Sequence, residues 1–306
     1  MKQVKQVKLE DLVFIDTETA RLQKDLVEGT PDYEAWEYMV KRMAENGEID
    51  VKEDYLNRSG LYAEFSRLVC ISVGRIKDGK LVITSYKDAD EKTMLERFMG
   101  DLDEVVKYRP DTKLVGHSVK GFDIPFIFRR ALVNYVTPNR LIDVGGLKPW
   151  ELTCLDTKDL WKGSGYYNAS LIAVCLALGI PSPKSDITGA EVGDVYHSEG
   201  EAGLTRIAEY CERDVMAVAN VILRWRFEPI FEDYVSQEPR EKRELGLLER
   251  IAKTGEITDE DKAEILSKVK GASIDDKEKQ IKIIKASLIV SQKELDQDLE
   301  LAILTA

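Results

Sequence analysis

The sequence predicts an α/β protein, in which helices flank a mixed β-sheet and a helical appendage follows toward the C-terminus. Three observations carry this prediction. Short apolar runs typical of buried strands alternate with longer amphipathic segments. Two of the runs are joined by an Asp-Gly turn, which makes part of the sheet antiparallel. After Tyr234 the chain contains no aromatic residue and is densely charged, which separates the appendage from the rest.

The first strand is predicted at residues 8–15, because the run Leu-Val-Phe-Ile does not alternate with polar residues and is typical of a strand buried on both faces. Residues 20–62 then interrupt the alternation of strands and helices. We predict that they form an insertion containing a helix, because four apolar residues recur there at helical spacing: Trp36, Met39, Val40 and Met43.

A hairpin is predicted at residues 67–87, with its turn at Lys77-Asp78-Gly79-Lys80. Beyond it, short apolar runs predict strands at 113–118 and 152–161. Amphipathic or capped segments predict helices at 89–106, 123–136, 168–180 and 203–227. An antiparallel hairpin followed by strands that alternate with helices gives a mixed sheet with helices on its faces.

Two domains are predicted, at residues 1–232 and 233–306. In the second, a Thr or Ser followed by acids predicts helix starts near residues 258 and 273. The apolar stripes of these helices need burial, either against the first domain or against each other. This appendage could mediate an oligomer or a contact with another protein, and without aromatic residues it has no platform for stacking bases.

Composition narrows the possible chemistry. The 306 residues carry a net charge of −12, which argues against coating of duplex DNA by a basic face. With two histidines and four cysteines that form no C-x-x-C pair, any metal must be held by carboxylates, and Mg²⁺ or Mn²⁺ is then expected. No apolar run is long enough to span a bilayer, and the N-terminus lacks the apolar core of a signal peptide, so we expect a cytoplasmic protein without membrane contacts.

Asp16 and Glu18 follow the first apolar run directly. Strand side chains repeat every two residues, so both carboxylates point to the same face. Two like charges side by side are unfavourable unless a cation lies between them. The alternative is that the strand leaves the core at this point and both acids are solvated.

Two further acidic positions follow. Asp123 stands after a buried strand and opens a helix, where it could be an ordinary N-cap. Tyr210 and Asp214 are four residues apart on a helix and therefore share a face, although each alone could be a core tyrosine and a solvated acid. Taken together, four carboxylates around one point would need two divalent ions, as in a two-metal site for phosphoryl transfer.

Asp16-x-Glu18, Phe122-Asp123 and Tyr210-x-x-x-Asp214 in this order resemble the three motifs of the DEDDy 3′–5′ exonucleases. The closest resemblance is to stand-alone enzymes related to the proofreading domain of family B DNA polymerases, and it covers about residues 9–228. It implies a ribonuclease H-like fold and a site with two Mg²⁺ or Mn²⁺ ions. Their ligands would be Asp16, Glu18, Asp123 and Asp214, and Tyr210 would orient the attacking water.

The resemblance also implies contacts to the substrate. Phe122 would pack beside the terminal nucleotide, with Thr17, Ser118 and Lys120 as further substrate-binding residues. Relatives usually carry Asn where this chain has Ser118, which leaves the contacts of that position open, and Lys120 could equally be a solvated loop lysine.

The expected activity is removal of nucleoside 5′-monophosphates from the 3′ ends of single-stranded DNA. Two alternatives stay open. An RNA exonuclease would use the same chemistry and differ in how it treats the 2′-OH. A catalytically inactive module that binds nucleic acid or acts as a scaffold would keep the fold without turnover.

Overall fold

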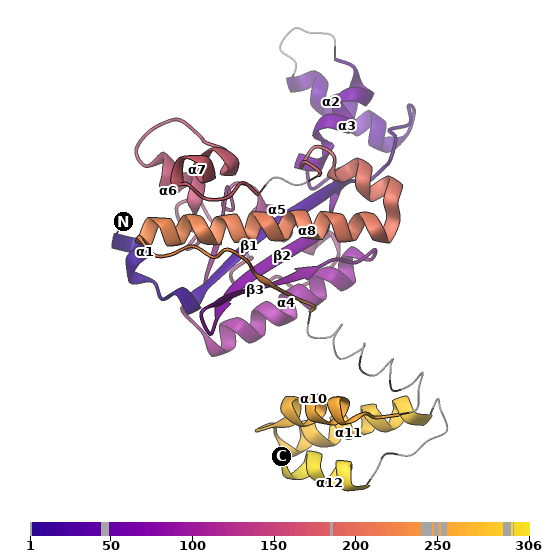
Figure 1. Cartoon of the computed structure of the whole chain (residues 1–306). Helices are drawn as coiled ribbons and strands as arrows, with labels where there is room; N and C mark the ends of the chain where they lie inside the picture. Colours follow the sequence, from indigo (N-terminus) through magenta and orange to yellow (C-terminus); the bar gives the residue numbers. More distant parts are fainter. Residues whose placement is uncertain are drawn as a thin grey trace. The chain divides into compact units, whose positions relative to one another are not determined.

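The computed structural model describes residues 2–43, 49–183, 186–239, 247, 251, 256–289, 295 and 297–306 (Figure 1). The chain divides into two compact units, Met1–Gln237 and Glu238–Ala306. The first unit reaches Gln237 rather than the predicted boundary at residue 232, because Val235–Gln237 form a strand of its sheet.

The first unit is built on a six-stranded mixed sheet with the order β5-β4-β1-β2-β3-β6. The central strand β1 pairs antiparallel with β2 and parallel with β4, and β2 pairs antiparallel with β3. The short strands β5 and β6 pair in parallel with β4 and β3 and form the two edges. The strands are β1 (Leu12–Arg21), β2 (Ser66–Lys77), β3 (Lys80–Tyr86), β4 (Lys113–Gly116), β5 (Leu155–Asp156) and β6 (Val235–Gln237).

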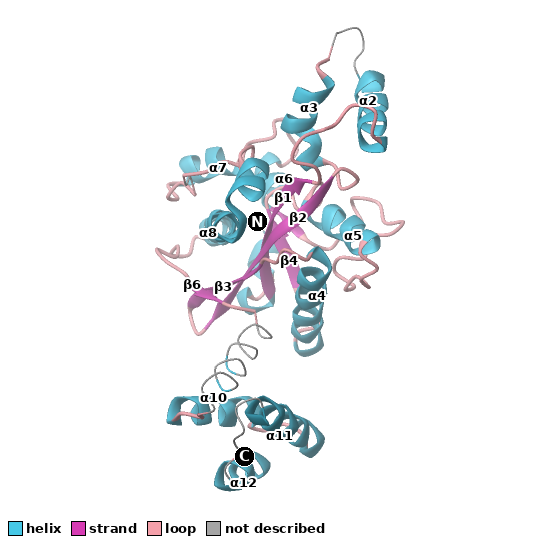
Figure 2. Cartoon of the chain, turned by 90° about the vertical axis from the view of Figure 1, so that its right-hand side faces the viewer, coloured by secondary structure: helices cyan, strands magenta, loops and turns pink. Residues whose placement is uncertain are grey.

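Helices cover both faces of this sheet (Figure 2). On one face, α4 and α5 pack against apolar residues of β1 and β2; on the other, α7 and α8 lie over the sheet. The predicted fold class, a mixed sheet flanked by helices, is confirmed. The helices of this unit are α1 (Lys2–Gln6), α2 (Pro31–Met43), α3 (Val51–Arg58), α4 (Glu91–Tyr108), α5 (Asp123–Val133), α6 (Thr157–Lys162), α7 (Leu171–Leu178) and α8 (Val192–Arg226), with 3₁₀ turns at Leu9–Asp11 and Ser59–Leu61.

Side-chain alternation along β1 decides which residues meet α8. Val13 and Ile15 belong to the core beneath α4 and α5, whereas Leu12 and Phe14 belong to the core beneath α8. Continuing the alternation places Asp16 on the α8 side of the sheet and Thr17 on the α5 side.

α8 also packs very closely against β2. A Cβ added to Gly74 of β2 would lie 2.6 Å from Val215 Cγ1 of α8, so only a glycine fits there. Val215 is the residue after Asp214, and this close approach therefore brings the acidic part of α8 down onto the sheet.

The predicted insertion is a helical segment with its own core. Trp36 is fully buried at the centre of a cluster with Leu26, Val40, Val51 and Tyr55. The segment contacts the sheet through Thr19 of β1, whose hydroxyl donates to the Gly60 carbonyl over 2.7 Å. Figure 2 shows α2 and α3 beyond the end of the sheet to which the arrow of β1 points.

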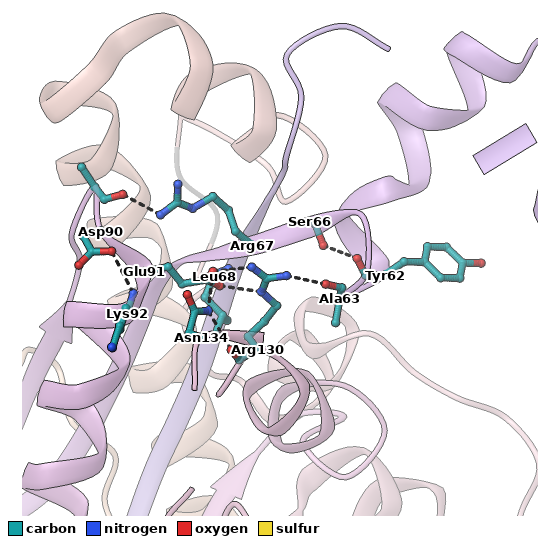
Figure 3. A network of polar contacts seen from close by, with 11 residues as sticks. Tyr62, Ala63, Ser66, Arg67, Leu68, Asp90, Glu91, Lys92, Arg130 and Asn134 are labelled. Carbon is teal, nitrogen blue, oxygen red and sulfur yellow. Dashed lines mark hydrogen bonds and ion pairs between the residues drawn. The ribbon is translucent and has the colours of Figure 1, made fainter. Parts of the chain in front are cut away.

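A buried ion pair fixes the return of the chain from this insertion (Figure 3). Arg130 of α5 donates to both carboxylate oxygens of Glu91 at the start of α4, at 2.9 and 2.6 Å, and to the Ala63 carbonyl at 2.8 Å. The Glu91 carboxylate also accepts from the Leu68 backbone N–H and from Asn134 Nδ2. One pair of charges thereby joins two helices, β2 and the end of the insertion.

The structure corrects four element predictions. β1 begins at Leu12 and continues to Arg21, so its acids lie within the strand and not at its end. The predicted strand at 152–161 is only Leu155–Asp156, and α6 follows it at once because the Asp156 carboxylate caps that helix. A kink at the non-helical Gly200 divides α8; the predicted helix at 203–227 is its second part, and the part that begins at Val192 was not predicted. The strand β6 was not predicted.

The second unit is helical, as predicted. It contains α10 (Asp259–Val269), α11 (Ile274–Ile289) and α12 (Gln297–Thr305). Thr258 and Asp261 form a reciprocal capping box, which confirms the helix start predicted near residue 258. The apolar stripes of these helices pack against one another: Ile265, Val269, Ile281, Ile284 and Leu288 share one buried cluster. Within the described residues, no helix is long and apolar enough to cross a bilayer.

Candidate active site

Two carboxylates project from the middle of the central strand. Asp16 and Glu18 stand opposite Ser72 and Cys70 of β2. The register shifts after Glu18, where β2 carries the extra residue Val69, and such bulges re-aim neighbouring side chains. Glu18 is only 8% exposed, so most of its side chain lies inside the protein.

The helix α8 supplies a second set of polar groups to the same place. The Cys211 thiol lies 3.3 Å from both Oδ2 and the backbone carbonyl of Asp16. One ligand atom each from Asp16, Glu18 and Cys211 lie within 4.8 Å of one another. On the adjoining turn, the Tyr210 phenol lies near the Asp214 carboxyl and partly offsets the rise in its pKa, as their spacing on the helix allows.

The fourth carboxylate arrives from the other side of β1. Asp123 is the first residue of α5 and is 3% exposed. Its Oδ1 accepts a 2.8 Å hydrogen bond from the Thr17 hydroxyl, which ties α5 to the strand between the two acids of β1. Thr17, predicted as a substrate-binding residue, thus has its hydroxyl engaged with a carboxylate of the site.

The acids interact strongly enough to change one another's ionisation. Burial raises the pKa of Asp16 well above its usual range, and the neighbouring Glu18, Asp123 and Asp214 raise it further. Burial and the Asp214 charge likewise raise the pKa of Glu18. Burial raises the pKa of Asp123 to about 6, and burial with the Asp123 charge raises that of Asp214 to about 7. Each of the four predicted metal ligands thus interacts through its charge with at least one of the others.

The residues present fit divalent cations. Within the described ranges, no Lys or Arg forms an ion pair with any of these four acids, and the Glu18 carboxylate accepts no hydrogen bond. Buried carboxylates without a counter-charge are unfavourable unless protonated or bound to a cation. An oxygen-rich donor set is the kind that Mg²⁺ and Mn²⁺ prefer.

The loop between β4 and α5 carries the other predicted substrate residues. Ser118 adopts a left-handed conformation with φ of 73°, which the Asn expected here from the resemblance would tolerate better than most residues. The buried Asp156 carboxylate accepts from the backbone N–H groups of Ser118 and Lys120, at 2.9 and 3.1 Å. These two hydrogen bonds fix the backbone of the loop between β4 and α5.

The side chains of this loop are engaged within the protein. The Ser118 hydroxyl lies 3.2 Å from Lys158 Nζ, and Lys120 Nζ pairs with Asp159 at 3.0 Å. Phe122 is half-buried against Phe126, with ring centroids 5.3 Å apart. To reach a phosphate, Lys120 would have to leave a partly exposed ion pair, whose contribution is typically small.

Sequence reasoning missed three residues of this region. Cys211 lies three residues before Asp214, so helical spacing alone places it on the same face. Asp156 was read as part of a strand, although an Asp before Thr-Lys-Asp is an N-cap signal. Lys158 had no signal in the sequence, because only the fold brings its amine to Ser118.

The raised carboxyl pKa values predict how stability depends on pH. In EDTA, the folded protein holds protons on Asp123 and Asp214 at pH values where the unfolded chain has lost them, so folding is favoured at low pH. We expect the melting temperature of the metal-free protein to fall as pH rises from about 4 to about 7, between the ordinary and the raised pKa values, and to level off above that. Added Mn²⁺ should raise it most at pH 8. Circular dichroism melts at pH 5 to 8, with and without Mn²⁺, measure both effects; a melting temperature in EDTA that rises over this range would contradict the burial of these charges.

The chain is similar to a known protein family in sequence and to a solved structure in fold. Residues 59–259 match the model of a family described as a predicted 3′–5′ exonuclease related to the exonuclease domain of PolB. Among solved structures, the family B DNA polymerase from the hyperthermophilic archaeon Pyrobaculum calidifontis aligns with a TM-score of 0.43 and 16% identity. That alignment covers 71% of this chain and 24% of the polymerase, so the chain spans about a quarter of that protein's length. No curated protein matches the sequence. Since the family model covers most of the chain, the protein belongs to the family of predicted 3′–5′ exonucleases related to the exonuclease domain of PolB.

Proposed function

We propose that the protein is a metal-dependent exonuclease that hydrolyses the terminal phosphodiester at the 3′ end of single-stranded DNA and releases nucleoside 5′-monophosphates. The observation that supports this most is the gathering of four acids and a tyrosine from β1, α5 and α8, with no Lys or Arg of the described residues paired to these acids. Family membership supports the same reaction.

Asp16, Glu18, Asp123 and Asp214 would hold two Mg²⁺ or Mn²⁺ ions. When bound, such ions supply a nucleophile at neutral pH and stabilise the leaving oxygen. The protein's own contribution is to hold the carboxylates in place. Thr17 fixes Asp123 through a hydroxyl that donates to the carboxylate, and the Tyr210 phenol would orient Asp214 in the same way.

Tyr210 would position water and not remove its proton. Burial and the surrounding carboxylates raise the pKa of the Tyr210 phenol, so it stays neutral and acts as a hydrogen-bond donor. Ser118, Lys120 and Phe122, in the loop before α5, would meet the terminal nucleotide and its phosphate.

A cytoplasmic location also stays a prediction.

The test is digestion of 3′- and 5′-labelled oligonucleotides of single-stranded DNA and RNA with Mn²⁺, with Mg²⁺ and in EDTA. We expect mononucleotides to leave the 3′ end of DNA only when a divalent ion is present. Cleavage of RNA with DNA untouched would identify the substrate as RNA. If neither DNA nor RNA is cleaved although the protein binds metal, the protein would be a catalytically inactive module that binds nucleic acid.

Tyr210→Phe is expected to lower kcat by about 10²- to 10⁴-fold, the range typical of a positioned acid–base or orienting group. Affinity for Mn²⁺ should change little, because the phenol is not a ligand in this assignment. Single-turnover digestion gives the rate, and Mn²⁺ titration followed by electron paramagnetic resonance gives the affinity. An unchanged kcat would remove Tyr210 from the site. Tyr196→Phe, which alters a partly buried tyrosine of the same helix, is the matched control.

Deletion of residues 238–306 is expected to leave kcat/KM on short oligonucleotides within about threefold. All proposed site residues lie in the first unit, and a cut after Gln237 keeps β6. Steady-state kinetics on both forms, with circular dichroism as a check of folding, measure the effect. A folded truncation that loses a hundredfold, about 2.7 kcal/mol of transition-state stabilisation, would place part of the second unit in catalysis.

A further inference from the structure

The sulfur atom at this acidic centre has no role in the reaction proposed above. Cys211 is fully buried, and its thiol lies 3.3 Å from Asp16 Oδ2. A free thiol against a carboxylate donates a weak hydrogen bond, which a threonine or serine would provide as well. A thiol differs from these in its affinity for softer metal ions.

The three ligand atoms are close enough to share one ion. Oxygen atoms of Asp16 and Glu18 and the sulfur of Cys211 all lie within 4.8 Å of one another. Around a zinc ion, oxygen ligands lie at about 2.0–2.2 Å and sulfur at about 2.3 Å, so tetrahedral neighbours are roughly 3.5 Å apart. Movements of about 1 Å at the ends of these side chains would complete the coordination.

Glu18 independently indicates that an ion belongs at this position. Its side chain is more than nine-tenths buried, and within the described part of the chain its carboxylate has no hydrogen-bond donor and no ion pair. One of its oxygens lies within 4.8 Å of ligand atoms of Asp16 and Cys211. A buried carboxylate without a partner is unfavourable, and a cation between it and the other two groups removes that cost.

We propose that Asp16, Glu18 and Cys211 form a mixed oxygen–sulfur site for a borderline-soft divalent cation of the zinc type, overlapping the position of the catalytic ions. The expected consequence is that Zn²⁺ inhibits the nuclease, and this consequence rests on the proposed function. Zn²⁺ would displace the Cys211 proton to solvent and bind the thiolate, whereas Mg²⁺ prefers oxygen ligands and would leave the thiol protonated. Since the carboxylates are shared, bound Zn²⁺ would exclude Mg²⁺.

Cobalt and cadmium report sulfur ligation directly. Full-length protein is titrated with Co²⁺ and with Cd²⁺ in the ultraviolet and visible range, where metal–thiolate charge transfer absorbs. We expect one thiolate band per protein in the wild type and none in Cys211→Ser. The affinity for Zn²⁺ should fall at least about a hundredfold in this variant, because loss of outer-shell partners alone lowers affinity roughly 10–100-fold. The affinity for Mn²⁺ should change by less than about threefold.

Two cysteine variants serve as matched controls. Cys70→Ser alters the thiol opposite Glu18, and Cys175→Ser alters a buried thiol of α7; both should keep the band. Absence of a band in the wild type overturns the proposal whether or not any variant folds. A band that persists in Cys211→Ser, or that disappears in Cys70→Ser alone, overturns the assignment to Cys211.

The outcomes separate this inference from the proposed function. A protein that shows the Cys211-dependent band but digests no nucleic acid would refute the nuclease and keep the sulfur site. A protein that digests DNA with Mn²⁺ but shows no band would do the reverse. If both hold, micromolar Zn²⁺ added to the Mg²⁺ reaction should inhibit the wild type and Cys175→Ser to the same extent and Cys211→Ser less, each relative to its own rate without Zn²⁺.

Discussion

Asp214→Asn is expected to lower the rate of 3′-end digestion by at least about 10³-fold, or roughly 4 kcal/mol of transition-state stabilisation. The substitution removes one of the proposed anionic ligands and the charge beside the Tyr210 phenol while keeping the side chain's size. The metal-free variant should melt at a higher temperature than the wild type at pH 8, because one charge leaves a repelling cluster. Single-turnover digestion with Mn²⁺ and melts in EDTA measure the two effects.

Glu209→Gln is the matched control for that experiment. It removes one negative charge from the same helix, but Glu209 is exposed and makes only a long contact of 3.9 Å to Arg213. We expect its rate and melting temperature to stay near those of the wild type. Digestion by Asp214→Asn at the wild-type rate would show that this acid is not a ligand, and the two-metal assignment would fail with it.

Glu91→Gln is expected to destabilise the protein by about 3–5 kcal/mol, because it leaves the buried Arg130 charge without its partner. The amide could still accept from Arg130 with its oxygen, but the bidentate pairing and the bond to the Leu68 N–H cannot all be kept. Urea denaturation followed by circular dichroism measures the loss. Glu96→Gln, in the same helix, breaks an exposed contact to Lys92 of 3.8 Å and should cost less than about 0.5 kcal/mol.

The double variant Glu91→Leu with Arg130→Met tests whether the charges or the contacts matter. Replacement of a buried pair by apolar residues is often neutral or stabilising. Recovery of stability would show that the loss in Glu91→Gln comes from the unpaired charge. If Glu91→Gln is as stable as the wild type, the pair contributes little, and the return of the insertion to the sheet is fixed by other contacts.

The sequence predicted correctly which site residues lie side by side within one strand or one helix. Alternation placed Asp16 and Glu18 on one face, and helical spacing placed Tyr210 beside Asp214, because both relations depend only on local backbone geometry. The apolar core of the insertion around Trp36 was also visible as a helical stripe. These signals need no knowledge of the rest of the fold.

Relations between elements were harder to predict. The apolar run of β1 ends at Ile15, yet the strand continues to Arg21 because β2 pairs with it along the whole length. The polar residues of β1 beyond Ile15 include the acids of the candidate site. Their polarity therefore did not mark the end of the strand. β6 is too short to show a period, and it exists only because β3 offers it an edge. Thr17 stays a predicted substrate-binding residue, and the sequence did not indicate that the alternation of β1 turns its hydroxyl to Asp123.

The shortness of the two outer strands has a consequence for self-association. An exposed strand edge presents unpaired backbone groups that can recruit the same edge of another molecule. Here β5, with two residues, and β6, with three, stand at the two borders of the sheet. β6 pairs with Val82, Ile83 and Thr84 at the middle of the apolar strand β3. A proteolytic cut or frameshift before Val235 would uncover that stretch, so such shortened chains should form fibrils or precipitates at concentrations where the intact protein stays clear.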